Sequence, residues 1–181
     1  MIEGGSIFEM RTGACEVRTV GRRLEGYAAL FDTEARIGGR FSETIRAGAF
    51  AGSLAGDVLA LVDHDASRVL ARTKSGTLRL REDTRGLAFD MDVPDTTAGR
   101  DVLALAARGD LGGMSFGFTV PKGGEHWSGE KRELRAVTLR EISVVQAWPA
   151  YQGTTVQARN QAANLPVSHR LALASRYLET L

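Results

Sequence analysis

The chain has 181 residues, of which 43% are hydrophobic and 25% charged, and this predicts one globular domain with or without short appendages. Such a composition excludes a disordered, fibrous or membrane-spanning chain. The 23 lysines and arginines nearly balance the 22 aspartates and glutamates, so the formal net charge of +1 argues against a surface built to neutralise nucleic-acid phosphates. The single cysteine, Cys15, excludes an intrachain disulfide and a cysteine-rich zinc site.

Three regions follow one another along the chain. Residues 1–20 contain Glu3 and Glu9 but no apolar run, which predicts an N-terminal arm and neither a signal peptide nor a membrane anchor. Residues 21–158 hold the strand and helix patterns and form the predicted main domain. Residues 159–181 predict a linker and a helical tail, whose apolar face is formed by Leu171, Ala174, Leu178 and Leu181.

The first half of the main domain predicts strands. Residues 26–31 form a short apolar segment followed by a turn, and residues 58–62 form an apolar run that ends at Asp63-His64-Asp65. The apolar spacing of residues 45–54 permits a short helix between them. Three further apolar or alternating segments predict an antiparallel meander: residues 69–71, 77–80 and 87–93.

The second half begins with a helix and returns to strands. Residues 96–109 predict a helix that Thr96 or Thr97 caps and Gly109 ends. Residues 114–120 predict a strand in which Ser115 lies on the face opposite the apolar side chains. The polar, glycine-rich residues 123–131 predict a loop, and residues 134–145 predict another strand, with or without a bulge.

Residues 113–117 match the pattern Gly-x-Ser-x-Gly, which in nucleophile-elbow hydrolases places a serine on a strand-to-helix turn. Here Ser115 follows a predicted helix and begins a predicted strand, so that fold is excluded. Elbow hydrolases also place their histidine last, whereas His126 and His169 fall in the predicted loop and tail, and we interpret both as surface residues. A purely structural serine between closely packed glycines remains an alternative.

His64 lies at a strand end between two aspartates. A hydrogen-bonded surface histidine is one interpretation. The carboxylates of Asp63 and Asp65 are also suited to favour the imidazolium, to orient the ring, or to bind a hard metal with it. Because no second histidine or carboxylate pair lies nearby at ligand spacing, we predict no metal site and no cofactor.

Glu141 interrupts an apolar strand, where a carboxylate must lie on the outer face or bind a partner such as a histidine N–H. Together with His64 and Ser115 it supplies the three groups of a serine hydrolase: a nucleophile, a base and a group that orients the base. Backbone N–H groups near Gly112 and Gly113, or in the turn after Val145, are equally suitable oxyanion donors.

An ordered set of short motifs resembles the prohead (procapsid maturation) serine proteases of tailed bacteriophages. The resemblance runs from about Gly26 to Arg159 and includes the segments 26–32, 43–50, 64–65, 72–78, 86–87, 114–118 and 139–145. This family is distantly similar to the herpesvirus assemblins, so the resemblance implies an α+β, mainly β, fold: a β-barrel surrounded by a few helices. Residues 21–158 would then be the protease domain.

The resemblance also implies roles for individual residues. Ser115 would be the nucleophile, His64 the general base, and Glu141 would stand where the assemblins have a second histidine. A carboxylate orients an imidazole at least as well as another imidazole, so this difference is chemically sensible. The assemblins carry arginines for the oxyanion after this position, whereas residues 146–151 of this chain contain none, which leaves the donors unassigned.

The function that the resemblance implies is a serine endopeptidase of capsid maturation, in a phage, a prophage or a gene transfer agent. Its substrates would be the major capsid protein, the scaffold segment and itself, and it would act in the bacterial cytoplasm inside the immature procapsid. A homodimer is plausible from the assemblins, and no nucleic-acid or membrane partner is expected. The helical tail would dock onto shell or scaffold. The alternatives are a non-enzymatic capsid or scaffold module of the same fold, and a hydrolase with a deep small-molecule pocket.

Overall fold

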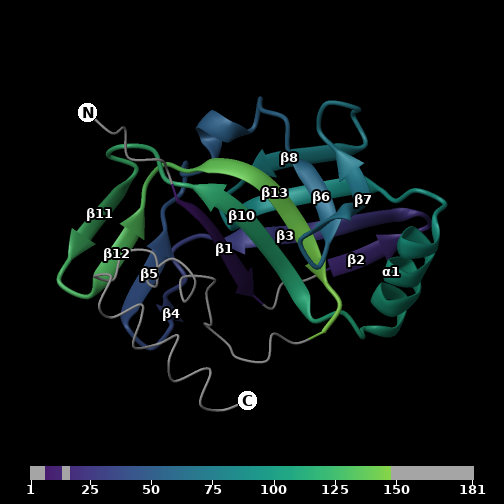
Figure 1. Cartoon of the computed structure of the whole chain (residues 1–181), viewed down its shortest axis with the longest axis horizontal. Helices are drawn as coiled ribbons and strands as arrows, with labels where there is room; N and C mark the ends of the chain where they lie inside the picture. The colour runs from purple at the N-terminus through teal and green to yellow at the C-terminus, as the bar shows by residue number, and fades with distance from the viewer. Residues whose placement is uncertain (1–6, 14–16, 148–181) are drawn as a thin grey trace, which may run out of the picture.

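The computed structural model describes residues 7–13 and 17–147 (Figure 1). This part of the chain is mainly β, with thirteen strands in three sheets, one α-helix and one 3-10 turn. In Figure 1, strands β10 and β13 cross the middle of the molecule, with β11, β12, β5 and β4 at one end and α1 at the other. The mainly β prediction is therefore confirmed, whereas closure of the sheets into a barrel stays a prediction.

The five-stranded sheet carries the residues of interest. Its order is β1-β10-β13-β6-β7, and only the β13–β6 pair among its neighbours is parallel. The strand bounds in that order are Phe8–Gly13, Gly113–Thr119, Thr138–Val145, Leu59–Val62 and Asp65–Arg72.

Two four-stranded sheets complete the architecture. One has the order β11-β12-β5-β4, with bounds Glu125–Ser128, Lys131–Leu134, Phe41–Ile45 and Ala35–Ile37. The other has the order β2-β3-β9-β8, with bounds Val17–Val20, Arg23–Leu30, Gly86–Asp92 and Leu78–Glu82. Strands β1 and β2 of the predicted arm thus pair with strands of the predicted main domain, and the division at residue 20 stays a prediction.

One hydrophobic core joins the three sheets. Along a strand, successive side chains point to opposite faces, so the apolar side chains at every second position all face this core. Strand β10 contributes Met114, Phe116 and Phe118, all buried, and the ring of Phe116 packs edge-on against Phe50. Ser115 and Gly117 therefore point away from this core, as the alternation predicts.

The helix α1 (Thr97–Arg108) confirms the sequence prediction. Its N-cap is Thr96, whose hydroxyl accepts a hydrogen bond from the N–H of Gly99 at 3.1 Å. Gly109 ends the helix in the left-handed conformation, with φ 75°. Within residues 7–13 and 17–147, no helix is long and apolar enough to cross a membrane.

Several predicted strands are confirmed, and three predictions are wrong in part. Residues 69–71 belong to β7, which pairs with β6 in the five-stranded sheet, so the meander consists of β8 and β9 without β7. The predicted loop at residues 123–131 contains β11 and the start of β12, paired through His126 and Glu133. The predicted strand at 134–145 is two strands, because the chain leaves β12 at Leu134 and enters β13 at Thr138.

The short helix allowed for residues 45–54 is a single 3-10 turn, Ala51–Ser53. Residues 41–44 had no predicted element, and with Ile45 they form the almost fully buried strand β5. The predicted linker and helical tail at 159–181 lie outside the described residues.

Candidate active site

Two neighbouring strands place two serines side by side. Ser115 on β10 and Ser143 on β13 are register partners in the antiparallel ladder, and Gly117 is the partner of Glu141 two positions along. Because residues two apart on a strand share a face, Ser115, Ser143 and Glu141 all point to the side of the sheet opposite the core. Both serine side chains are fully buried, with 0% of their surface exposed.

His64 reaches this face from the turn that joins β6 and β7. The turn has two residues, Asp63 and His64, with φ of 50° and 61°, as a two-residue hairpin of the primed type requires. The second position of such a turn favours glycine, and a histidine there is held in a conformation that non-glycine residues rarely adopt. The Asp63 N–H donates to the carbonyl of Val144 at 3.0 Å, which fixes the turn to the end of β13.

A three-residue hydrogen-bonded unit joins the turn to β13. Nδ1 of His64 lies 2.7 Å from Oε1 of Glu141. The hydroxyl of Ser143 donates to the other carboxylate oxygen, Oε2, at 2.5 Å, and accepts from the backbone N–H of His64 at 3.2 Å. The Glu141 carboxylate is 8% exposed and the His64 imidazole 24%. One side of the ring therefore lies in solvent, while the hydrogen bond to Glu141 fixes its orientation. This leaves Nε2 as the ring nitrogen available for proton transfer.

Ser115 is hydrogen-bonded to strand β1. Its hydroxyl donates to the backbone carbonyl of Arg11 at 2.8 Å and accepts from the Thr12 hydroxyl at 3.0 Å. Strand β13, with Glu141 and Ser143, lies between β10 and β6, the strand that leads to His64. The structure therefore brings the three predicted residues to one face, while the hydroxyl of Ser115 is turned toward the edge strand.

Glycine is required for structural reasons at both ends of the Gly-x-Ser-x-Gly pattern. Gly113 has φ 140°, a conformation that residues with a side chain rarely adopt. At Gly117 an added Cβ would lie 2.4 Å from Oε1 of Glu141 and 2.4 Å from the ring of Phe8. Because Gly117 has no side chain, there is room beside it for the Glu141 carboxylate, which binds His64.

One N–H group in each of the two candidate sources of oxyanion donors is engaged in another hydrogen bond. The N–H of Gly112 donates to the carbonyl of Val145 at 2.8 Å, and the N–H of Gln146 donates to the carboxylate of Asp63 at 2.9 Å. These bonds close the end of the β10–β13 pair next to the His64 turn. They also give Asp63 a structural role, which the sequence left open.

The metal alternative has no support in the described part of the chain. Asp65 accepts hydrogen bonds from the N–H and the hydroxyl of Ser67, and these lower the pKa of its carboxyl. No group of three or more His, Cys, Asp or Glu side chains within residues 7–13 and 17–147 is arranged to hold a metal ion. His126 lies exposed on β11, as expected for a surface residue, and His169 lies outside the described residues.

A buried charge network anchors β1 on the core side of the sheet. The Arg11 guanidinium binds both carboxylate oxygens of Glu43, at 2.6 and 2.8 Å, and one oxygen of Glu9 at 2.7 Å. Arg132 binds Glu9 at 2.7 and 2.8 Å and Glu43 at 2.9 Å. Burial alone would raise the pKa of the Glu9 carboxyl, but its hydrogen bonds and charge interactions with Arg132 and Arg11 lower it overall. The network joins β1 to β5 and β12.

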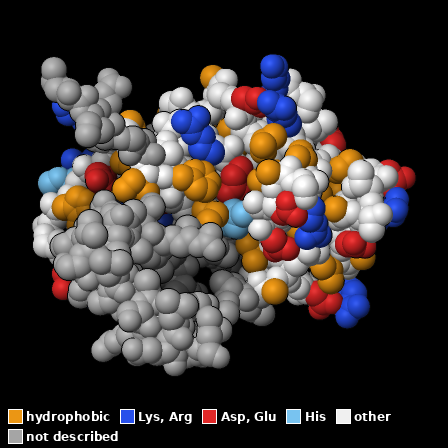
Figure 2. All heavy atoms as spheres, in the orientation of Figure 1, with side chains coloured by type: hydrophobic (Ala, Val, Ile, Leu, Met, Phe, Trp, Pro, Cys, Tyr) orange, Lys and Arg blue, Asp and Glu red, His pale blue; other side chains and the backbone are white. Residues whose placement is uncertain are grey.

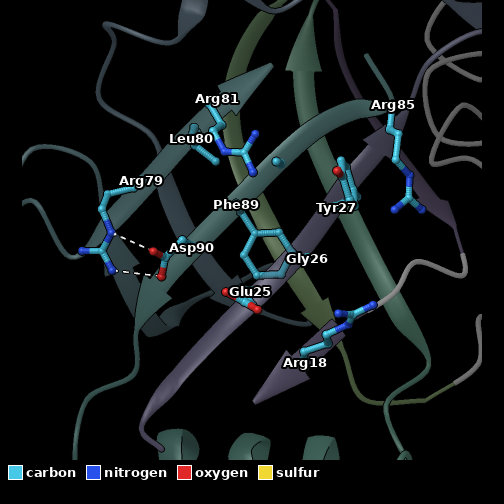
Figure 3. Close-up of a pocket in the computed structure, with 11 residues that line it drawn as sticks. Arg18, Glu25, Gly26, Tyr27, Arg79, Leu80, Arg81, Arg85, Phe89 and Asp90 are labelled. Atoms are coloured by element: carbon cyan, nitrogen blue, oxygen red, sulfur yellow. Dashed lines mark hydrogen bonds and ion pairs between the residues drawn. The ribbon is translucent and has the colours of Figure 1, made fainter. Parts of the chain in front are cut away.

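A separate hollow of about 520 Å³ lies on the β2-β3-β9-β8 sheet (Figure 3). Arginines surround it, and Figure 3 shows Arg79 bound to Asp90 at its edge. Neither Ser115, His64 nor Glu141 lines it, so it gives no support to the alternative of a deep substrate pocket at these residues. In Figure 2, acidic and basic side chains are interspersed over the described part of the face that is seen in Figure 1, in keeping with the near-zero net charge.

Ser143 and Thr12 are the site residues that sequence analysis missed. Ser143 stands two positions after Glu141 in a predicted strand, and this i, i+2 spacing was the available signal that the two side chains share a face. Thr12 had no such signal, because its partner on β10 is 103 residues away.

Comparison with known proteins relates the chain as a whole to a family and a fold. The family described as "Caudovirus prohead serine protease" matches residues 9–166. The fold is similar to the solved structure of the bacteriophage T4 capsid assembly protease, gp21, with a TM-score of 0.52 and 9% sequence identity, covering 81% of this chain and 99% of that one. No curated protein matches the sequence.

Proposed function

The chain belongs to the caudovirus prohead serine protease family, and from this premise we propose that it is a serine endopeptidase of capsid maturation in which Ser115 is the nucleophile. The observation that carries the proposal is the His64–Glu141 pair, 2.7 Å apart and fixed on the same face of the sheet as Ser115. A serine needs a base to remove its proton, and a histidine base needs a third group to hold its ring.

The proposed mechanism begins with a rotation of the Ser115 hydroxyl from the Arg11 carbonyl toward His64. The oxygen attacks the substrate carbonyl carbon while Nε2 of His64 takes its proton, and Glu141 stabilises the resulting imidazolium. The C–N bond of the tetrahedral intermediate then breaks, and the imidazolium gives its proton to the leaving amine. Water hydrolyses the acyl-enzyme with His64 again as base, which frees the acid product and restores Ser115.

Ser143 has a positioning role in this proposal. Its hydroxyl binds Oε2 of Glu141, which leaves Oε1 directed at His64. Its contact with the His64 N–H also supports the left-handed backbone of the turn. The same side chain thus orients both the carboxylate and the residue that the carboxylate holds.

For the substrates we propose the major capsid protein and its scaffold segment, followed by the protease itself, all enclosed in the immature procapsid. The family match supports this choice of substrate class. An extended peptide chain is the form in which a protease binds such segments.

Co-expression with the major capsid protein of the same phage or phage-derived particle tests the function. Wild type, Ser115→Ala and the control Ser128→Ala, which changes an exposed serine on β11, are compared by intact mass of the capsid protein. We expect truncation with wild type and the control and none with Ser115→Ala. Equal truncation with Ser115→Ala would overturn the nucleophile assignment, and assembled but uncut particles with every variant would favour the non-enzymatic module.

A further inference from the structure

Strand β1 closes the edge of β10 on which Ser115 lies. Six residues of β1 pair in register with β10, from Phe8 with Thr119 to Gly13 with Met114. Both hydrogen bonds described for the Ser115 hydroxyl run to this strand. A nucleophile whose oxygen is fully buried and bonded to its own chain has no place for a substrate carbonyl.

The other edge of β10 is occupied by an element that the chemistry needs. Strand β13 carries Glu141 and Ser143, so its removal would take away the carboxylate that orients the base, His64. Strand β1 carries none of the three proposed catalytic groups. If an extended peptide is to pair with the strand that bears the nucleophile, the β1 side is therefore the edge it must use.

We propose that β1 is an exchangeable strand: it occupies the peptide-binding edge of β10, and its departure exposes Ser115 to an extended substrate segment that pairs antiparallel in its place. This inference rests on the proposed function. It gives the chain a resting state in which the base is assembled and the nucleophile is blocked.

The charge network allows β1 to leave without stranding a charge. The strand carries Glu9 and Arg11, which bind each other at 2.7 Å and together have no net charge. After they leave, Arg132 keeps two carboxylate partners, Glu43 at 2.9 Å and Glu125 at 2.6 Å. An unpaired buried charge is the main electrostatic barrier to such an exchange, and this arrangement avoids it.

The side-chain pattern of β1 indicates how a substrate would lie. Phe8, Met10 and Thr12 share the face of Ser115, whereas Glu9 and Arg11 point to the network on the other face. The ring of Phe8 lies against Gly117, beside the carboxylate of Glu141. A substrate strand in this register would present alternate side chains to these two environments.

A reversible cross-link tests the exchange. In a Cys15→Ser background, Phe8→Cys and Thr119→Cys place two thiols on register partners at the far end of β1 from Ser115. Register partners have Cα atoms about 4.5–5.5 Å apart, within the range that a disulfide spans. The measurement is the rate at which a fluorophosphonate probe labels Ser115 before oxidation, after oxidation and after reduction. Each single cysteine variant, treated identically, serves as the control.

We expect oxidation to slow labelling at least tenfold in the double variant alone, and reduction to restore it. Equal labelling of the oxidised and reduced double variant would overturn the exchange while leaving Ser115 a reactive serine. Absence of labelling in the reduced protein and in wild type would instead overturn the proposed nucleophile, and the exchange with it.

Discussion

Ser115 and Ser143 are register partners on adjacent strands, yet their hydroxyls bind in opposite directions across the sheet. Ser115 binds the backbone of β1, and Ser143 binds Glu141 and the N–H of His64. One serine is therefore free of the histidine–carboxylate unit and the other is part of it. This division is the reason to assign attack to Ser115 and positioning to Ser143.

Ser143→Ala tests the positioning role. Loss of one hydrogen bond to a buried charged group costs about 1.5–3 kcal/mol, and if the whole of this is lost from the transition state, kcat falls roughly 10- to 150-fold. KM should change little, because Ser143 does not face the substrate, and Ser143→Thr should recover most of the activity because it keeps a hydroxyl. Steady-state kinetics on a peptide substrate checks this; an equal loss in the threonine variant would contradict it.

Gly117→Ala tests the space reserved for the carboxylate. The new methyl group would lie 2.4 Å from Oε1 of Glu141, so the carboxylate must move away from His64. We expect at least a tenfold loss of activity. Gly52→Ala is the matched control, because an added Cβ there meets nothing within 4 Å. Both proteins should unfold cooperatively in urea, and full activity of Gly117→Ala would show that the contact is not required.

His64→Asn separates the conformation of the turn from its chemistry. Asparagine adopts the left-handed conformation more readily than histidine, which offsets part of the lost hydrogen bond to Glu141. We expect a free energy of unfolding within about 2 kcal/mol of wild type and loss of activity. Urea denaturation and cleavage assays measure the two effects; retained cleavage would remove His64 from the mechanism.

Acid should loosen β1 before it unfolds the chain. The pKa of Glu9 is lower in the folded state than in the unfolded state, so its contribution is complete at neutral pH and is lost as pH falls through the folded pKa. The protection of the β1 amides against hydrogen exchange, corrected for the intrinsic exchange rate at each pH, should therefore fall with acid more than that of the β9 amides. In Glu9→Gln this acid dependence should be weaker, and an unchanged profile would assign the effect to another group.

The sequence predicted the parts of the site that depend on local pattern. The apolar run into Asp63-His64, the alternation around Ser115 and the polar residue Glu141 within an apolar strand each reflect which side of one strand faces the core. Their order along the chain matched the family, and the structure brings them to one face.

The missed elements are those whose partners lie far away in sequence. Strand β1 carries Glu9 and Arg11 on its buried side, a charged pattern that is typical of an exposed strand. Besides each other, these residues bind Glu43 and Arg132, which lie 32 and 123 residues away. Glu43 in β5 is nearly fully buried for the same reason. Burial of a charge can be predicted only when its partner is known.

The central position of β13 limits where this molecule can move. It is hydrogen-bonded to β10 on one side and to β6 on the other, so sliding it by one residue would break two ladders and turn Glu141 and Ser143 into the core. The position of His64, which Glu141 and Ser143 hold, is thus fixed by the central strand of the sheet. Any opening that admits a peptide must occur at the margins, and regulation can act there without disturbing the catalytic unit.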